Sequence, residues 1–124
     1  MRHAILPASG EKFYDPENFP KFLESLFLER AELLCRELSI KDNENEGTAR
    51  IYHIMPQNIT LVYSSIKRAK YNDITIYFAG EKEKVDQLVK IIHDAEKKSE
   101  IMKLEEIIKE IRGKINSEVN NSLK

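Results

Sequence analysis

Two apolar stripes within residues 85–115 point in different directions, and this mismatch limits how the end of the chain can fold. At about 100° per residue, the second stripe is rotated by roughly 150° from the first in a helical projection. One straight helix packed on one core cannot bury both stripes. The chain therefore either turns near Ser99–Glu100 into a second helix, or forms one long helix that offers its second side to something else. The first stripe is Val85, Leu88, Ile92, Ala95, Ser99 and Met102, and the second is Ile101, Leu104, Ile108, Ile111 and Ile115.

The second stripe is the candidate interface, because aliphatic residues at this spacing make a continuous seam between helices. We expect it to join two copies of the chain in a homodimer, or to bind a protein partner. The alternative is a helical hairpin whose second arm folds back on a helix predicted at residues 20–38. We accordingly divide the chain into an α+β core domain, residues 1–99, and a C-terminal helical extension, residues 100–124, which either belongs to the same domain or is an oligomerisation helix.

A central helix is predicted at residues 20–38. Proline fits the first turn of a helix, so Pro20 marks its start. The apolar residues that follow cover more than half of the helical circumference, which is wider than the stripe of a surface helix. We therefore expect this helix to be covered on more than one side, with Leu26, Leu34 and Leu38 deeply buried.

The middle of the chain changes to the period-2 alternation of β-strands. Residues 51–55, 59–64 and 74–79 predict a three-stranded antiparallel sheet, with a hairpin across residues 67–73. Residues 4–6 suggest a fourth, short N-terminal strand. With the central helix and one or two C-terminal helices, the predicted fold class is α+β.

Composition excludes several classes of protein. The chain has 124 residues, enough for one domain with its own core, and 20 basic against 21 acidic residues, which argues against a strongly basic nucleic-acid wrapper. Its single cysteine cannot form an internal disulfide. Apolar residues nowhere run together over the roughly 18 positions that a membrane span needs. We expect a cytoplasmic protein that does not enter a membrane.

Residues with catalytic or metal-binding chemistry are scattered. Asp42–Gly47 resembles the first half of a calcium loop, but His53 stands where the bidentate glutamate is needed. His3, His53 and His93 have no metal-ligand spacing with Cys35. Glycine-rich phosphate loops and nucleophile elbows are absent from the sequence. We expect no metal, cofactor, catalytic residue or small-molecule ligand, and an enzyme is disfavoured, although a small enzyme with an unrecognised site remains a third interpretation.

A basic hairpin is the candidate nucleic-acid contact: Lys67, Arg68, Lys70 and Tyr71 combine cations for phosphate with a ring for stacking. Tyr52, Tyr63 or Tyr77 would extend the stacking surface. The alternative is ordinary protection of a sheet margin by lysine. Our leading interpretation is a non-enzymatic interaction or regulatory protein that self-associates or binds a partner through its C-terminal helix. A nucleic-acid-binding regulator is the alternative.

Overall fold

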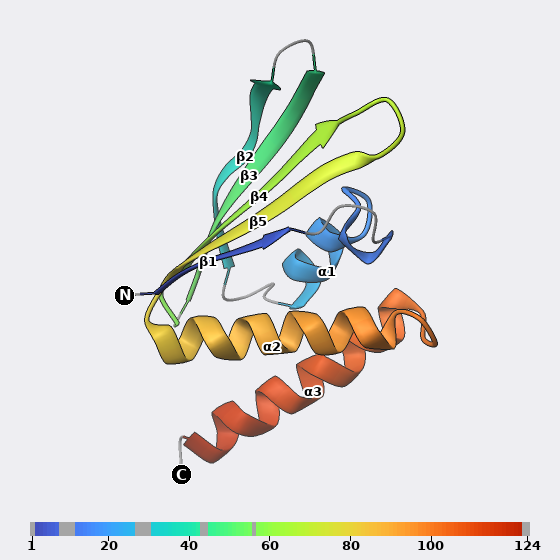
Figure 1. Ribbon diagram of the computed structural model, residues 1–124. Helices are drawn as coiled ribbons and strands as arrows, with labels where there is room; N and C mark the ends of the chain where they lie inside the picture. Colours follow the sequence, from blue (N-terminus) through green and yellow to red (C-terminus); the bar gives the residue numbers. More distant parts are fainter. Residues whose placement is uncertain (1, 8–11, 27–30, 43–44, 56, 123–124) are drawn as a thin grey trace.

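The computed structural model describes residues 2–7, 12–26, 31–42, 45–55 and 57–122. For residues 2–3, 31–37, 42 and 114–122 it describes the backbone only. It shows an α+β fold in which one antiparallel sheet carries helices on one face (Figure 1). A short 3-10 helix, Lys12–Tyr14, precedes the first α-helix. The elements are β1 Arg2–Pro7, α1 Phe19–Leu26, β2 Ala31–Asp42, β3 Asn45–Ile54, β4 Ile59–Lys67, β5 Asn72–Gly80, α2 Lys82–Lys98 and α3 Leu104–Ser122.

The sheet has five strands in the order β1-β5-β4-β3-β2, so the predicted three-stranded sheet is wrong. The strands predicted at residues 51–55, 59–64 and 74–79 correspond to β3, β4 and β5, and β4 and β5 form the expected hairpin. The N-terminal strand is present as β1, which pairs with β5. The fifth strand, β2, lies where the sequence predicted a helix.

The predicted central helix is wrong, because α1 ends at Leu26 and residues 31–42 form β2. Leu26 is buried as expected, but Leu38 is 46% exposed. Leu34 lies on β2, and its side chain is outside the described part. The over-wide apolar arc thus came from two elements: α1 has a helical apolar stripe, whereas β2 is a strand that pairs with β3 through an irregular register. Since no proline or glycine separates them in the sequence, the pattern carried no signal of the break.

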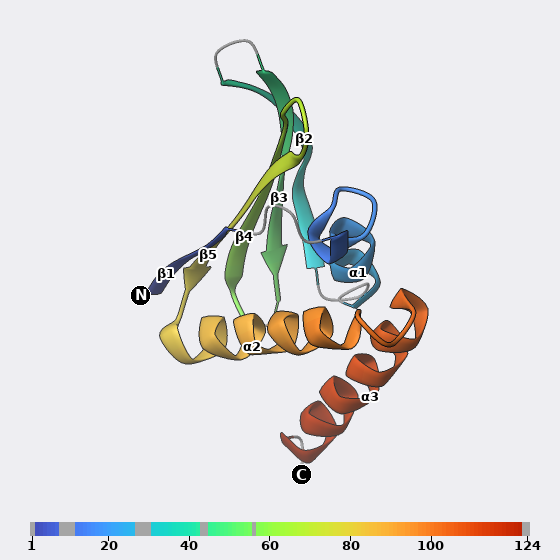
Figure 2. The ribbon, with the colours of Figure 1, turned by 45° about the vertical axis from the view of Figure 1, so that its right-hand side comes forward.

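Helices α1 and α2 lie on the same side of the sheet, at the end away from the β4–β5 turn (Figures 1 and 2). Alternate strand residues meet these helices, which is why every second residue of β4 and β5 is buried. α2 buries the first apolar stripe through Val85, Leu88, Ile92 and Ala95. The strand residues that face the helices include Tyr52, Ile54, Ile59, Leu61, Tyr63, Ile74, Ile76 and Phe78.

The two apolar stripes belong to two helices. α2 ends at Lys98, where Lys97 and Lys98 favour a helix C-terminus, and α3 begins at Leu104. The turn between them lets α2 bury Val85, Leu88, Ile92 and Ala95 while α3 buries Ile108 and Ile111. Ion pairs join α3 to its neighbours, Glu105 to Lys21 of α1 at 3.3 Å and Glu110 to Lys98 of α2 at 2.6 Å.

Candidate interaction surface

The sheet face opposite α1 and α2, here called the open face, carries no helix of the described chain (Figure 2). Strand register aligns the residues of this face in rows that cross the sheet. In the central row each residue is the direct partner of the next on the neighbouring strand. This row is Ile5, Tyr77, Val62, Ile51 and Cys35.

The neighbouring rows mix apolar and polar residues, and the second of them reaches Glu32 on β2, the register partner of His53. One row is Pro7, Thr75, Ser64, Ala49 and Leu38, and the other contains Ala79, Thr60 and His53. Across the three rows, the positions on β3, β4 and β5 hold no Asp, Glu, Lys or Arg. Ile5 and Leu38, near the two edges, are 67% and 46% exposed. An uncovered apolar patch of this kind commonly marks a surface that another molecule contacts.

His53 borders this surface and has a local partner. Its Nε2 lies 2.6 Å from Oδ1 of Asn58. The register places His53 on the same face as Ile51, opposite Thr60 of β4. It therefore sits at the margin of the open face, as part of a hydrogen bond that ties β3 to the turn before β4.

The basic hairpin forms the β4–β5 turn, far from α2 (Figure 1). The turn is closed by the Arg68 N–H, which donates to the Tyr71 carbonyl at 2.9 Å. Arg68 also pairs with Asp73 at 3.0 Å, so one of the three cations is neutralised locally. Lys67 and Lys70 are exposed, and Tyr71 is 53% exposed.

The tyrosines expected to widen a stacking surface do not lie together. Tyr52 and Tyr63 are buried on the helix-covered face, and only Tyr77 lies on the open face. Strand alternation explains the separation, because Tyr77 and its partner Val62 point away from the residues that meet α1 and α2. The hairpin and Tyr77 therefore remain the aromatic and basic groups available for a nucleic acid.

The predicted interface stripe is divided by the structure. Ile108 and Ile111 join the core cluster, together with Ile107, which the stripe omitted. Leu104 packs partly against that core. Ile101 lies in the turn before α3 and is 85% exposed. Ile115 is on α3, but its side chain is outside the described part.

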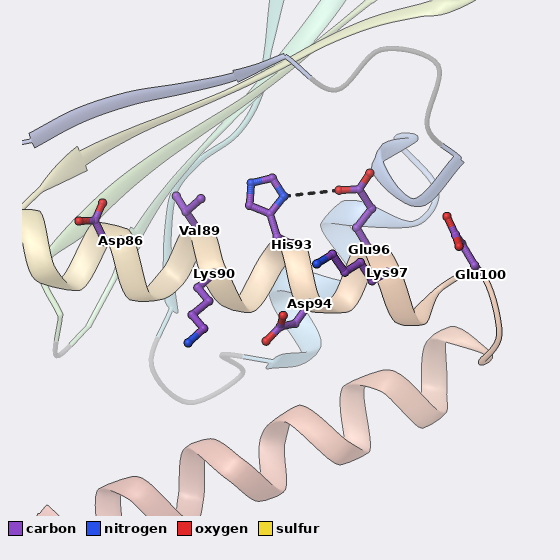
Figure 3. Close-up of a pocket in the computed structure, with 8 residues that line it drawn as sticks. All are labelled: Asp86, Val89, Lys90, His93, Asp94, Glu96, Lys97 and Glu100. Atoms are coloured by element: carbon purple, nitrogen blue, oxygen red, sulfur yellow. Dashed lines mark ion pairs between the residues drawn. The ribbon is translucent and has the colours of Figure 1, made fainter.

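A shallow pocket of about 640 Å³ runs along α2 (Figure 3). His93 and Glu96 rise from the same side of the helix, whereas Lys90 and Asp94 point the other way. Nδ1 of His93 lies 3.6 Å from Oε2 of Glu96, and the Tyr14 hydroxyl donates to that same oxygen at 2.8 Å. These contacts tie the 3-10 helix to α2. Among the described residues, no cluster of three or more His, Cys, Asp and Glu has a geometry that could hold a metal.

No helix in the described part of the chain combines the length and apolarity needed to cross a membrane. Comparisons with protein families, with curated proteins and with solved structures found no match to this chain.

Proposed function

We propose that this chain is an interaction protein that self-associates through the open face of its sheet. The single observation that carries the proposal is the uncharged apolar row across β1, β5, β4 and β3, formed by Ile5, Tyr77, Val62 and Ile51, on a face that no described helix covers. Removing such a row from water is favourable in proportion to the apolar area buried. The lone cysteine suits a reducing compartment, and we place the protein in the cytoplasm.

A second copy is the occupant that fits this face best. Two sheets can pack face to face at about 10 Å, with interdigitating side chains. Five strands at about 4.8 Å, over roughly seven residues, give a face of about 500 Å² per copy, so two copies together reach the roughly 1,000 Å² expected of a specific interface. The sheet replaces α3 as the proposed contact because Ile108 and Ile111 already pack within their own chain.

The test is the mass in solution of the wild-type protein and of Val62→Asp. Val62 lies in the middle of the central row, so a carboxylate there would be desolvated by association and should give a folded monomer. Gln87→Asp adds the same charge at an exposed site on α2 and should leave the mass unchanged. Light scattering measures the mass and circular dichroism reports folding. A wild-type protein that stays monomeric at high micromolar concentration contradicts the proposal.

Nucleic-acid binding is the second candidate function, favoured by the exposed Lys67, Lys70 and Tyr71 at one turn. Removing a cation that holds one phosphate should reduce the salt dependence of binding by a slope of about one. Lys67→Ala with Lys70→Ala should therefore weaken binding to mixed oligonucleotides and flatten that dependence. No binding of the wild-type protein to single- or double-stranded oligonucleotides at low salt would rule this candidate out.

A further inference from the structure

We propose that the groove between β1 and α2 binds an extended, basic segment of a partner protein, which joins the outer edge of β1 as a sixth strand. The proposal goes beyond self-association through the open face, because it uses a different part of the molecule. Strand addition gains affinity from backbone hydrogen bonds and specificity from pockets for alternate side chains. Here β1 supplies the backbone groups and α2 supplies the pocket.

β1 is the sheet edge better suited to accept a strand. Its six residues pair with β5 without a break in register, whereas the register of β2, at the other edge, shifts twice against β3. Irregular pairing and charged side chains both discourage strand addition at an edge. Residues 4–7 of β1 carry no charge, and no described strand pairs with the outer side of β1. This edge therefore lacks both kinds of protection.

Pro7 indicates which backbone groups of β1 face outward. Proline has no N–H, so in an edge strand its nitrogen is turned away from the sheet. Successive residues of a strand direct their N–H and C=O groups to opposite edges. Ile5, two residues before Pro7, therefore turns its N–H and C=O outward, whereas Ala4 and Leu6 direct theirs toward β5. An added strand would form its hydrogen bonds with the outward groups of Ile5.

α2 forms the wall of a groove beside this edge. β1 contacts α2, and Ala4, Leu6 and Val89 all pack against the same core cluster. Figure 3 shows the pale blue β1 running above α2, on the side toward which Val89 and His93 rise. The pocket along α2 extends over residues 86–100, about 21 Å at 1.5 Å per residue. β1 spans about 20 Å, so one extended segment could follow both.

The charges along the groove favour a basic occupant. Its lining contains four carboxylates and two lysines. The Glu96 carboxylate accepts a hydrogen bond from the Tyr14 hydroxyl, which helps to fix its position. Alternate side chains of an added strand would point toward α2, where basic groups would meet the carboxylates. The carboxylates belong to Asp86, Asp94, Glu96 and Glu100, and the lysines are Lys90 and Lys97.

The test uses two fluorescent peptides of about eight residues, a length that spans β1. One alternates lysine with valine, and the other alternates glutamate with valine. Fluorescence anisotropy at low salt should show the lysine peptide binding at least about tenfold more tightly than the glutamate peptide. The valines would extend the apolar row beside Ile5, and the lysines would lie in the groove.

A proline substitution tests the backbone contact. Ile5→Pro removes the outward N–H and places a ring where the added strand would lie, but it spares the bonds to β5. It should weaken binding of the lysine peptide at least about tenfold. Ile5→Ala keeps the N–H and should bind within about threefold of the wild type. Circular dichroism checks that both variants are folded.

A charge reversal tests the groove. Asp86→Lys with Glu100→Lys should reverse the preference, so that the glutamate peptide binds more tightly than the lysine peptide. Glu83→Lys with Glu106→Lys makes the same change in charge at exposed positions outside the groove and should keep the wild-type order. Val62→Asp, which lies in the middle of the open face, should also leave peptide binding unchanged.

Equal binding of the two peptides, or full binding to Ile5→Pro, overturns the proposal. If neither peptide binds and Ile5→Pro lowers the mass in solution where Ile5→Ala does not, β1 of a second copy occupies the edge and the proposal is wrong. A wild-type protein that is monomeric yet binds the lysine peptide with these preferences removes self-association and supports the groove as a separate site.

Discussion

Two buried tyrosines on the helix-covered face of the sheet differ in what their hydroxyls do. The Tyr63 hydroxyl donates to the Tyr14 carbonyl at 2.7 Å, and its ring stacks on Phe19 with 5.4 Å between the centroids. The Tyr52 hydroxyl is buried beside the Arg50 side chain and has no well-aligned hydrogen-bond partner among the described residues. Burial is the largest effect on both groups and raises the pKa of each above its usual value. Tyr63 therefore fastens the 3-10 helix to β4, whereas the Tyr52 hydroxyl adds desolvation cost.

Tyr63→Phe should lower the free energy of unfolding by about 0.5–1.5 kcal/mol at pH 7, because it removes the buried hydrogen bond to the Tyr14 carbonyl. Since its pKa is raised on folding, the stability that Tyr63 contributes is complete below pH 10.0, the usual pKa, and is lost as the pH rises further. The variant should therefore lose less stability than the wild type between pH 9 and about pH 11. Urea unfolding at these pH values measures both effects.

Tyr52→Phe is the comparison for this prediction. It removes a buried hydroxyl that has no well-aligned hydrogen-bond partner in the described part, so it should change the free energy of unfolding at pH 7 by less than about 0.5 kcal/mol. A decrease at Tyr52 as large as that at Tyr63 would mean that the two hydroxyls are equally well bonded. The different roles given to the two tyrosines would then be wrong.

At the level of elements, the sequence predicted the strands and the helix whose hydrophobic periodicity can be read within a single segment. β4 and β5 alternate strictly over nine residues each, and α2 has one clear stripe, so all three were found. β2 was missed because Leu33, Leu34 and Leu38 suit a helix by propensity and become a strand only through pairing with β3. The open face was missed for a related reason, since its central row exists only once the order of five strands is known.

The burial of α3 residues in the core can be tested by substitution. Ile108 and Ile111 are 9% and 4% exposed within the core, so Ile108→Ala should lower the free energy of unfolding by about 2–5 kcal/mol. Ile101→Ala, at an 85% exposed position of the preceding turn, should cost less than about 0.5 kcal/mol. Denaturant unfolding compares the two. If Ile108→Ala changes the mass in solution and leaves the stability of the folded chain intact, α3 is the interface that its apolar spacing first suggested.

In the whole molecule, the position of the helices determines which surface is left for a partner. α1 and α2 fill one face of the sheet, and α3 packs beside them through Ile107, Ile108 and Ile111. The chain therefore packs the first stripe and the Leu104, Ile108 and Ile111 part of the second against its own core, whereas no described helix covers the other face of the sheet. Two-layer domains usually bury one face of the sheet only, and an antiparallel sheet tolerates water on its second face when that face is polar. Here the second face is largely apolar, which is the physical basis for expecting a second copy on it.

Self-association of this kind makes thermal stability depend on protein concentration, because the folded dimer is favoured by mass action and the unfolded chain is not. The midpoint Tm of the wild-type protein should rise by roughly 2–4 °C for each tenfold increase in concentration across the range where dimers form. Val62→Asp, whose charge lies in the central row, should have a Tm that does not vary with concentration. Differential scanning calorimetry at three concentrations provides the measurement. A wild-type Tm that is constant over this range, in a protein of dimer mass, would show that the two chains separate before either unfolds, and that the open face contributes nothing to holding the fold.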